Sequence, residues 1–191
     1  MKIGIDIDNV ISNFNDALLN EYLLHDKVLR NSGIIDENAD IRRGMFDWNE
    51  DEETNFYQNN IERIAKNLGV IEDAKKYIDK LHYDGHFIYI ITGRNNGEYT
   101  DPYNMTKNWL DDNGIYYDNL ILTDAYDNCA KTKECLKHSI DIMIDDSVRI
   151  CDDCIKNGIT TILMDTPYNK YSNIQRVKNW KDFYRYISNY K

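Results

Sequence analysis

The chain has 191 residues and a formal net charge of −10, from 23 Lys and Arg against 33 Asp and Glu, and 42% of its residues are hydrophobic. This length suits one domain with at most a modest insertion, and the apolar fraction excludes a disordered chain. The negative charge disfavours long nucleic acids and anionic membrane surfaces as partners, because both would repel the protein. A small anionic substrate stays compatible with it, because a bound metal can override the overall charge.

The start of the chain and its cysteines indicate the cellular context. Two aspartates fall within the first eight residues, so we expect no signal peptide, and no uncharged apolar run approaches the ~18 residues of a membrane span. The cysteines are Cys129, Cys135, Cys151 and Cys154. We expect free thiols in a reducing cytoplasm. The C-x-x-C at 151–154 is interpreted as part of an ordinary helix, because no second Cys or His pair completes a zinc site.

The first part of the chain predicts one strand followed by helices. Residues 2–8 alternate apolar and polar side chains and run into two acids, which indicates a buried strand. Apolar residues then recur at helical spacing over 12–30, with Ser12 as the expected N-cap, and over 50–67 and 71–84. Residues 31–48 are irregular, so no strand is expected between 12 and 70.

From residue 87 onward, strands and helices alternate. We predict strands at 87–92, 119–123, 140–145 and 159–164, and helices at 101–114, 131–138, 147–157 and 180–187. This order predicts β-α-β units and therefore a three-layer α/β fold with a Rossmann-like parallel sheet. We predict that residues 1–11 and 71–191 form this core and that residues 12–70 form a small helical cap inserted after the first strand.

Polar side chains gather at the carboxyl ends of the predicted strands, where ligands bind in open α/β sheets. In chain order they are Asp6 and Asp8; Thr92, Gly93 and Arg94; Lys131 or Lys133, which opens a helix; and Asp145, Asp146 and Ser147. Several carboxylates cannot share one crevice without compensation. We therefore expect Mg²⁺, which combines protein carboxylates with substrate phosphate.

This set of side chains suits phosphoryl transfer. A lysine, the Thr92 hydroxyl and the Gly93 N–H can hold the oxygens of a phosphoryl group. Asp6 can attack phosphorus to give an aspartyl-phosphate, and Asp8 can protonate the leaving alkoxide and then deprotonate water. The competing interpretation is that these acids only cap helices and bind solvent ions.

Four segments, in this order, carry a family resemblance: Asp6-Ile7-Asp8-Asn9-Val10, Ile91-Thr92-Gly93-Arg94, a lysine within 131–133, and Ile144-Asp145-Asp146-Ser147. They resemble the four motifs of the haloacid dehalogenase superfamily of phosphohydrolases, and the resemblance spans residues 3–150. Asn9 departs from the pattern, because many members have Gly or another small residue there.

The resemblance implies a role for each motif. Asp6 would be the nucleophile and Asp8 the acid and base. Mg²⁺ would be held by Asp6, by the carbonyl of Asp8 and by Asp146, with Asp145 in support.

For the phosphate, the resemblance implies Thr92, Gly93 and Arg94 as ligands. It favours Lys131 as the lysine of the third motif, with Lys133 as the alternative.

The predicted cap and residues 165–169 resemble the superfamily branch that contains 5′(3′)-deoxyribonucleotidases and related bacterial nucleotidases. Phe14, Phe46, Trp48 and Phe56 could offer flat surfaces for a nucleobase, although packing of these rings in a small cap core is supported equally well. We therefore predict hydrolysis of a mononucleotide, with a deoxyribonucleotide as the candidate that the resemblance implies, through an aspartyl-phosphate.

Two alternatives compete with this prediction. A sugar phosphate or another small phosphate ester would suit the same motifs. A receiver-like signalling module also combines acids, Thr and Lys on an α/β sheet, but there the lone acceptor lies on a middle strand, whereas here the paired acids Asp6 and Asp8 come first. A non-catalytic descendant is disfavoured because no expected motif residue is missing.

Overall fold

A computed structural model describes residues 1–95 and 97–190 of the chain. Within these residues, six strands form a single sheet in the order β3-β2-β1-β4-β5-β6, and every neighbouring pair is parallel. The strands are β1 (Lys2–Ile5), β2 (Phe87–Thr92), β3 (Asn119–Leu122), β4 (Ile142–Asp145), β5 (Thr160–Met164) and β6 (Arg176–Val177). The predicted parallel α/β sheet is confirmed. The hydrophobic pattern does not indicate β6, because two residues are too few to show a period.

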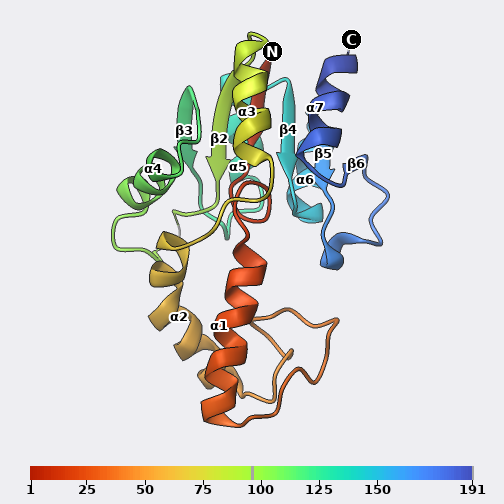
Figure 1. Cartoon of the computed structure of the whole chain (residues 1–191). Coiled ribbons are helices and arrows are strands. Elements are labelled where there is room, and N and C mark those ends of the chain that lie inside the picture. The colour runs from red at the N-terminus through yellow and green to blue at the C-terminus, as the bar shows by residue number, and fades with distance from the viewer. Residues whose placement is uncertain (96, 191) are drawn as a thin grey trace.

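Helices cover both faces of this sheet (Figure 1). α3 (Ala74–Tyr83) and α7 (Trp180–Asn189) pack against each other on one face, and α5 (Ala130–His138) and α6 (Val148–Lys156) pack on the other. α4 (Pro102–Asp112) lies beside the edge strand β3. The arrangement has the three layers that the sequence predicts.

Successive side chains of each strand serve opposite faces, as the period of two residues requires. In β2, Ile88 and Ile90 belong to the apolar cluster that includes α3 and α7. Tyr89 and Ile91 belong to the cluster that includes α5 and α6. Because helices cover both faces, β2 is apolar at successive positions instead of alternating with polar residues.

Residues 12–70 contain α1 (Phe14–Leu29) and α2 (Glu50–Lys66), which lie beyond the carboxyl ends of the strands in Figure 1. The two helices contact each other. Arg63 of α2 forms an ion pair with Glu21 of α1 at 2.6 Å. This segment therefore stands over the edge of the sheet at which the predicted motifs end.

The starts of α1 and α2 differ from each other. At α2, the Asn49 side chain accepts from the Glu52 N–H at 3.0 Å, and the Glu52 carboxylate accepts from the Asn49 N–H at 2.8 Å, which is a capping box. At α1, where we predict Ser12 as the N-cap, Asn13 takes that position and makes no side-chain capping hydrogen bond. The Ser12 hydroxyl instead donates to Asp8 Oδ1 at 3.1 Å.

The four cysteines are free thiols, and Cys151 and Cys154 are both buried on α6. The C-x-x-C segment therefore lies on a helix, as expected. Over the described residues, no helix combines the length and the apolar character that crossing a membrane requires.

Candidate active site

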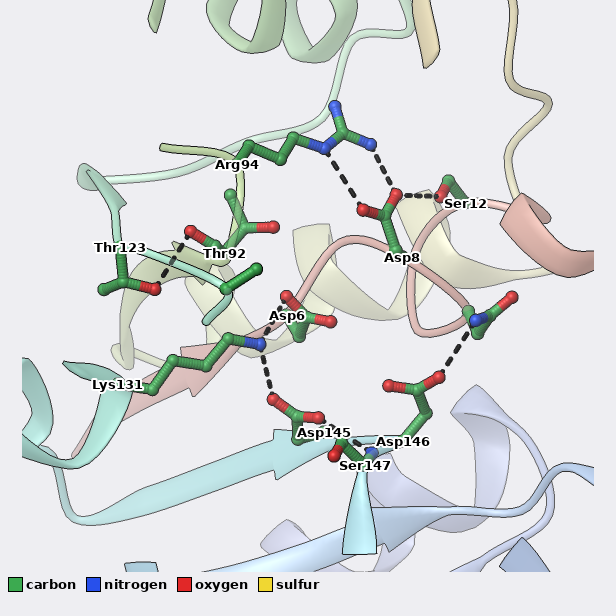
Figure 2. Close-up of polar contacts among 12 residues, drawn as sticks. Asp6, Asp8, Ser12, Thr92, Arg94, Thr123, Lys131, Asp145, Asp146 and Ser147 are labelled. Atoms are coloured by element: carbon green, nitrogen blue, oxygen red, sulfur yellow. Dashed lines mark hydrogen bonds and ion pairs between the residues drawn. The ribbon is translucent and has the colours of Figure 1, made fainter. Parts of the chain in front are cut away.

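The candidate site lies at the carboxyl ends of β1, β2 and β4, which are neighbours in the sheet. Asp6 follows β1 directly, Thr92 is the last residue of β2, and Asp145 is the last residue of β4. The Asp6 N–H donates to the Ile144 carbonyl at 3.1 Å, which keeps the chain beside β4 for one residue beyond the strand. Because parallel strands end at the same edge, side chains distant in sequence meet here (Figure 2).

Three buried carboxylates form the centre of the site. Asp6, Asp145 and Asp146 each place an oxygen within 4.8 Å of the others. Lys131 Nζ lies 2.8 Å from Asp6 Oδ1 and 2.6 Å from Asp145 Oδ2. No ion pair to Asp146 occurs among the described residues. One ammonium thus faces three carboxylates, and a buried charge without a partner is costly.

The electrostatics of this cluster follow from that imbalance. Burial raises the pKa of Asp6 to about 6, although Lys131 opposes the shift, and burial raises the pKa of Asp146 well above its ordinary value. For Lys131, burial favours the neutral amine, but the charges of Asp145 and Asp6 outweigh it and raise the pKa of the ammonium. The cluster offers buried carboxylate oxygens and has fewer positive than negative charges. These properties fit the binding of a divalent cation that prefers oxygen ligands.

Asp8 makes its contacts on a different side of the site. Arg94 donates to both of its oxygens, from Nε to Oδ2 at 3.2 Å and from an Nη nitrogen to Oδ1 at 2.5 Å. Ser12 donates to the same Oδ1. Figure 2 shows the Asp8 carboxylate turned toward Arg94 and Ser12. The fork of Arg94 and the serine hydroxyl therefore restrict the orientation of Asp8.

Two buried donors at the site have no hydrogen-bond partner among the described residues: the Thr92 hydroxyl and Nη1 of Arg94. Both side chains are inaccessible to solvent. A buried polar group without a partner costs about 1–3 kcal/mol, and such groups call for an explanation, such as a catalytic or ligand-binding role. Gly93 lies between them, where an added Cβ would approach the Ala125 backbone to 3.2 Å.

The structure brings Lys131, but not Lys133, to the acidic cluster. Lys131 is buried, whereas the side chain of Lys133 is 67% exposed and pairs with Asp127 at 2.9 Å. The alternative assignment to Lys133 therefore has no geometric support.

The aromatic residues expected to contact a base lie elsewhere. Phe46 and Trp48 are buried and pack against Tyr22, with ring centroids 5.8 and 4.9 Å from it. Phe56 closes the same cluster at 5.5 Å from Trp48. Phe46 and Trp48 thus lack the open ring faces that base stacking needs, because they pack in the apolar cluster between α1 and α2. Phe14, at the start of α1, is half-buried against the main core.

Other polar residues reach the site without having been assigned a role from the sequence. Tyr168 donates to Asp146 Oδ2, and Asn9 donates to the same oxygen at 2.9 Å. Asn169 donates to the Asp146 carbonyl at 2.9 Å. The signal for Tyr168 and Asn169 was the position of residues 165–169 after β5, at the same edge of the sheet as the four motifs, and the signal for Asn9 was its place in the first motif.

A family model described as "5′ nucleotidase, deoxy (Pyrimidine), cytosolic type C protein" matches residues 1–191. The chain belongs to this family. It is accordingly a hydrolase of phosphoric monoesters, with the fold of the haloacid dehalogenase superfamily. No curated protein matches the chain significantly.

Solved structures of haloacid dehalogenase-like hydrolases share this fold. A haloacid dehalogenase-like family hydrolase from Streptococcus pneumoniae superposes with a TM-score of 0.69 at 14% identity, and 97% of each chain is covered. A haloacid dehalogenase-like hydrolase from Xanthomonas campestris gives a TM-score of 0.66 at 11% identity, and the superposition covers 98% of this chain and 90% of the Xanthomonas chain. A predicted phosphoglycolate phosphatase from Haemophilus somnus gives 0.62 at 13% identity, covering 97% and 96%.

Proposed function

We propose that this protein is a Mg²⁺-dependent phosphomonoesterase that removes the phosphate of a nucleoside monophosphate. The observation that carries the proposal is the juxtaposition of a buried carboxylate cluster, short of positive charge, with the unpartnered hydroxyl of Thr92, the last residue of the neighbouring strand β2. A phosphate ester that binds with Mg²⁺ supplies what each lacks, because its oxygens can accept from the Thr92 hydroxyl and the cation offsets the carboxylates. Family membership adds independent support.

Asp6, Asp146 and the carbonyl of Asp8 would hold the metal ion, with Asp145 in support. When bound, Mg²⁺ supplies the positive charge that lets a phosphoryl group approach carboxylates. Lys131 adds an ammonium that is already fixed between Asp6 and Asp145. We propose that Thr92, the Gly93 N–H, Arg94 and Lys131 bind the phosphoryl oxygens.

The reaction proceeds in two displacements. A carboxylate oxygen of Asp6 attacks phosphorus, the P–O bond to the nucleoside breaks, and the leaving oxygen takes a proton from Asp8. Asp8 then accepts a proton from water, whose oxygen attacks the aspartyl-phosphate and breaks the P–O bond to Asp6. Inorganic phosphate leaves, and both aspartates return to their starting states.

We propose that residues 12–70 act as a cap and that the nucleoside lies at the junction between cap and core. There, Tyr57 of α2 and Tyr126 of the loop after β3 both donate to Glu98, at 3.3 and 2.7 Å. Tyr99 follows Glu98 in the chain, and burial and the charge of Asp8 raise its pKa. The junction therefore lies near Asp8, the proposed acid and base. Aromatic rings suit a base, since stacking is worth ~1–3 kcal/mol per base.

A substrate panel tests the proposal. With Mg²⁺, the purified protein is expected to release phosphate from nucleoside 5′- or 3′-monophosphates faster than from sugar phosphates or phosphoglycolate. EDTA is expected to abolish phosphate release, because the carboxylate cluster then lacks its cation. Excess Mg²⁺ is expected to restore the release. A preference for a sugar phosphate would favour the alternative substrate class. A stable phosphoprotein without turnover would favour a receiver-like role, and activity in EDTA would contradict the metal requirement.

Thr92→Val separates stability from activity. The valine keeps the shape of threonine but removes a hydroxyl that is buried without a partner, so the free energy of unfolding is expected to stay the same or to rise by about 1 kcal/mol. The catalytic efficiency kcat/KM is expected to fall ~10–100-fold, because a hydrogen bond to a charged group contributes ~1.5–3 kcal/mol. Urea unfolding and steady-state kinetics measure the two effects.

Thr106→Val is the matched control for this substitution. Thr106 lies on α4, is equally buried, and its hydroxyl also has no partner in the described part of the chain. It should reproduce the effect on stability without the loss of activity. Equal kinetics for Thr92→Val and Thr106→Val would remove Thr92 from the phosphate site.

A further inference from the structure

We propose that Asn9 and Tyr168 are positioning residues that hold Asp146 in the orientation in which it binds the metal ion. The inference rests on the proposed function, because it takes Asp146 as a ligand of Mg²⁺. Both residues direct a donor at the same oxygen, Asp146 Oδ2. Figure 2 shows the other oxygen of Asp146 turned toward Asp6, on the side where the three carboxylates meet.

Asn9 is built for this contact. Its backbone has φ of 60°, in the left-handed region, which Asn tolerates better than most residues. Its side-chain oxygen accepts from the Asn15 N–H at 2.8 Å, and its amide nitrogen also donates to the Asn15 side-chain oxygen at 3.3 Å, so two contacts to Asn15 hold the amide. The amide nitrogen donates to Asp146 Oδ2 at 2.9 Å. The side chain is therefore clamped at both ends, between the first turn of α1 and the acid.

Tyr168 reaches the same oxygen from the opposite end of the chain. Its hydroxyl donates to Asp146 Oδ2 and accepts from the Asn9 amide at 3.2 Å. The ring is about half exposed, but its segment is anchored by Asn169, which donates to the carbonyls of Asp146 and Met164 at 2.9 and 2.7 Å. The phenol is thereby held over a carboxylate that pairs with no cation in the described part of the chain.

These contacts occupy one oxygen of Asp146 and leave the other for a cation. Without the contacts from Asn9 and Tyr168, the Asp146 carboxylate can rotate about its last side-chain bond. Metal binding must then fix this rotation, which makes the free energy of binding less favourable. Neighbours that orient a metal ligand typically change metal affinity by ~10–100-fold when they are removed.

Asn9→Gly and Tyr168→Phe test the inference. Glycine adopts φ of 60° without strain, so Asn9→Gly removes the side-chain contacts and keeps the backbone, and Tyr168→Phe removes only a hydroxyl. Each variant is expected to bind Mg²⁺ with a Kd raised ~10–100-fold, as measured by isothermal titration calorimetry and by the Mg²⁺ dependence of the melting temperature. The double variant should lose less than the product of the two factors, because both groups act on one oxygen.

Controls separate the possible outcomes. Tyr171→Phe, at a tyrosine that is 86% exposed, should bind Mg²⁺ like the wild type, and Asp146→Asn should lose binding. Wild-type affinity in both Asn9→Gly and Tyr168→Phe would overturn the inference alone. Tighter binding by Tyr168→Phe would also overturn it, because the phenol would then compete with the metal. A wild type without saturable Mg²⁺ binding would overturn the proposed function as well.

Discussion

Asp6→Asn is expected to reduce turnover of a mononucleotide by ~10⁴-fold or more, the scale seen when a catalytic nucleophile is removed. The amide is a poor nucleophile, so no aspartyl-phosphate can form. Acid quenching during turnover should trap phosphate on a peptide that contains Asp6 in the wild type and on none in the variant. Full activity in Asp6→Asn would contradict the proposed mechanism.

This variant should remain folded, which separates loss of chemistry from loss of structure. Burial already raises the pKa of Asp6 to about 6, so the fold disfavours the charge that the substitution removes. The melting temperature in EDTA is therefore expected to stay at or above that of the wild type. Asp51→Asn, at an exposed position in the first turn of α2, is a matched control and should change neither property.

Lys131→Met is expected to lose activity and also to destabilise the protein by ~3–5 kcal/mol, the cost of breaking a buried ion pair on one side. The ammonium lies within 2.8 Å of Asp6 and 2.6 Å of Asp145. Without it, the cluster keeps three buried carboxylates and no cation. Urea unfolding in EDTA measures the stability, and phosphate release with saturating Mg²⁺ measures the activity.

Lys133→Met is the control, because it makes the same chemical change two residues away. Lys133 pairs with Asp127 at the surface, and exposed pairs of this kind contribute little. Stability and kcat are expected to match those of the wild type. Equal effects of the two substitutions would contradict the assignment of Lys131 to the site.

The destabilisation by Lys131→Met is expected to shrink as the pH falls. Asp6 has a pKa of about 6 in the folded protein against 3.8 for the free group, so the folded state binds its proton more tightly. Stability from this group is thus present at low pH and is lost as the pH rises through about 6. The charge of Lys131 lowers the pKa of Asp6, so its removal raises that pKa further. The pH range in which Asp6 loses its contribution to stability therefore moves upward. A difference in stability between variant and wild type that is as large at pH 5 as at pH 8 would contradict this.

Much of the architecture could be predicted because it depends on local patterns. The apolar runs of β2 and β4 and the helical spacing in α1, α2 and α3 identify the elements, since burial of apolar faces requires those periods. Alternation of strands and helices implies a parallel sheet, and a parallel sheet places every strand end at one edge. Asp6, Thr92 and Asp145 could therefore be grouped before any contact was known.

The choice between two lysines could not be made in the same way. Lys131 and Lys133 both lie in the first turns of α5, and two positions apart on a helix means directions about 200° apart around its axis. Only the packing of α5 on the sheet decides which side faces Asp6 and Asp145. The family resemblance favoured Lys131, and the geometry gives the reason.

The sequence by itself determined the class of fold, the edge of the sheet at which chemistry occurs and the residue types gathered there, because periodicity and strand direction are local properties. The tertiary structure decided which partner each side chain takes. Arg94 pairs with Asp8, Phe46 and Trp48 pack inside the cap, and Tyr168 and Asn9, 22 and 137 residues from Asp146, share one of its oxygens. These pairings depend on side-chain rotamers and on contacts between distant segments, which no local pattern encodes.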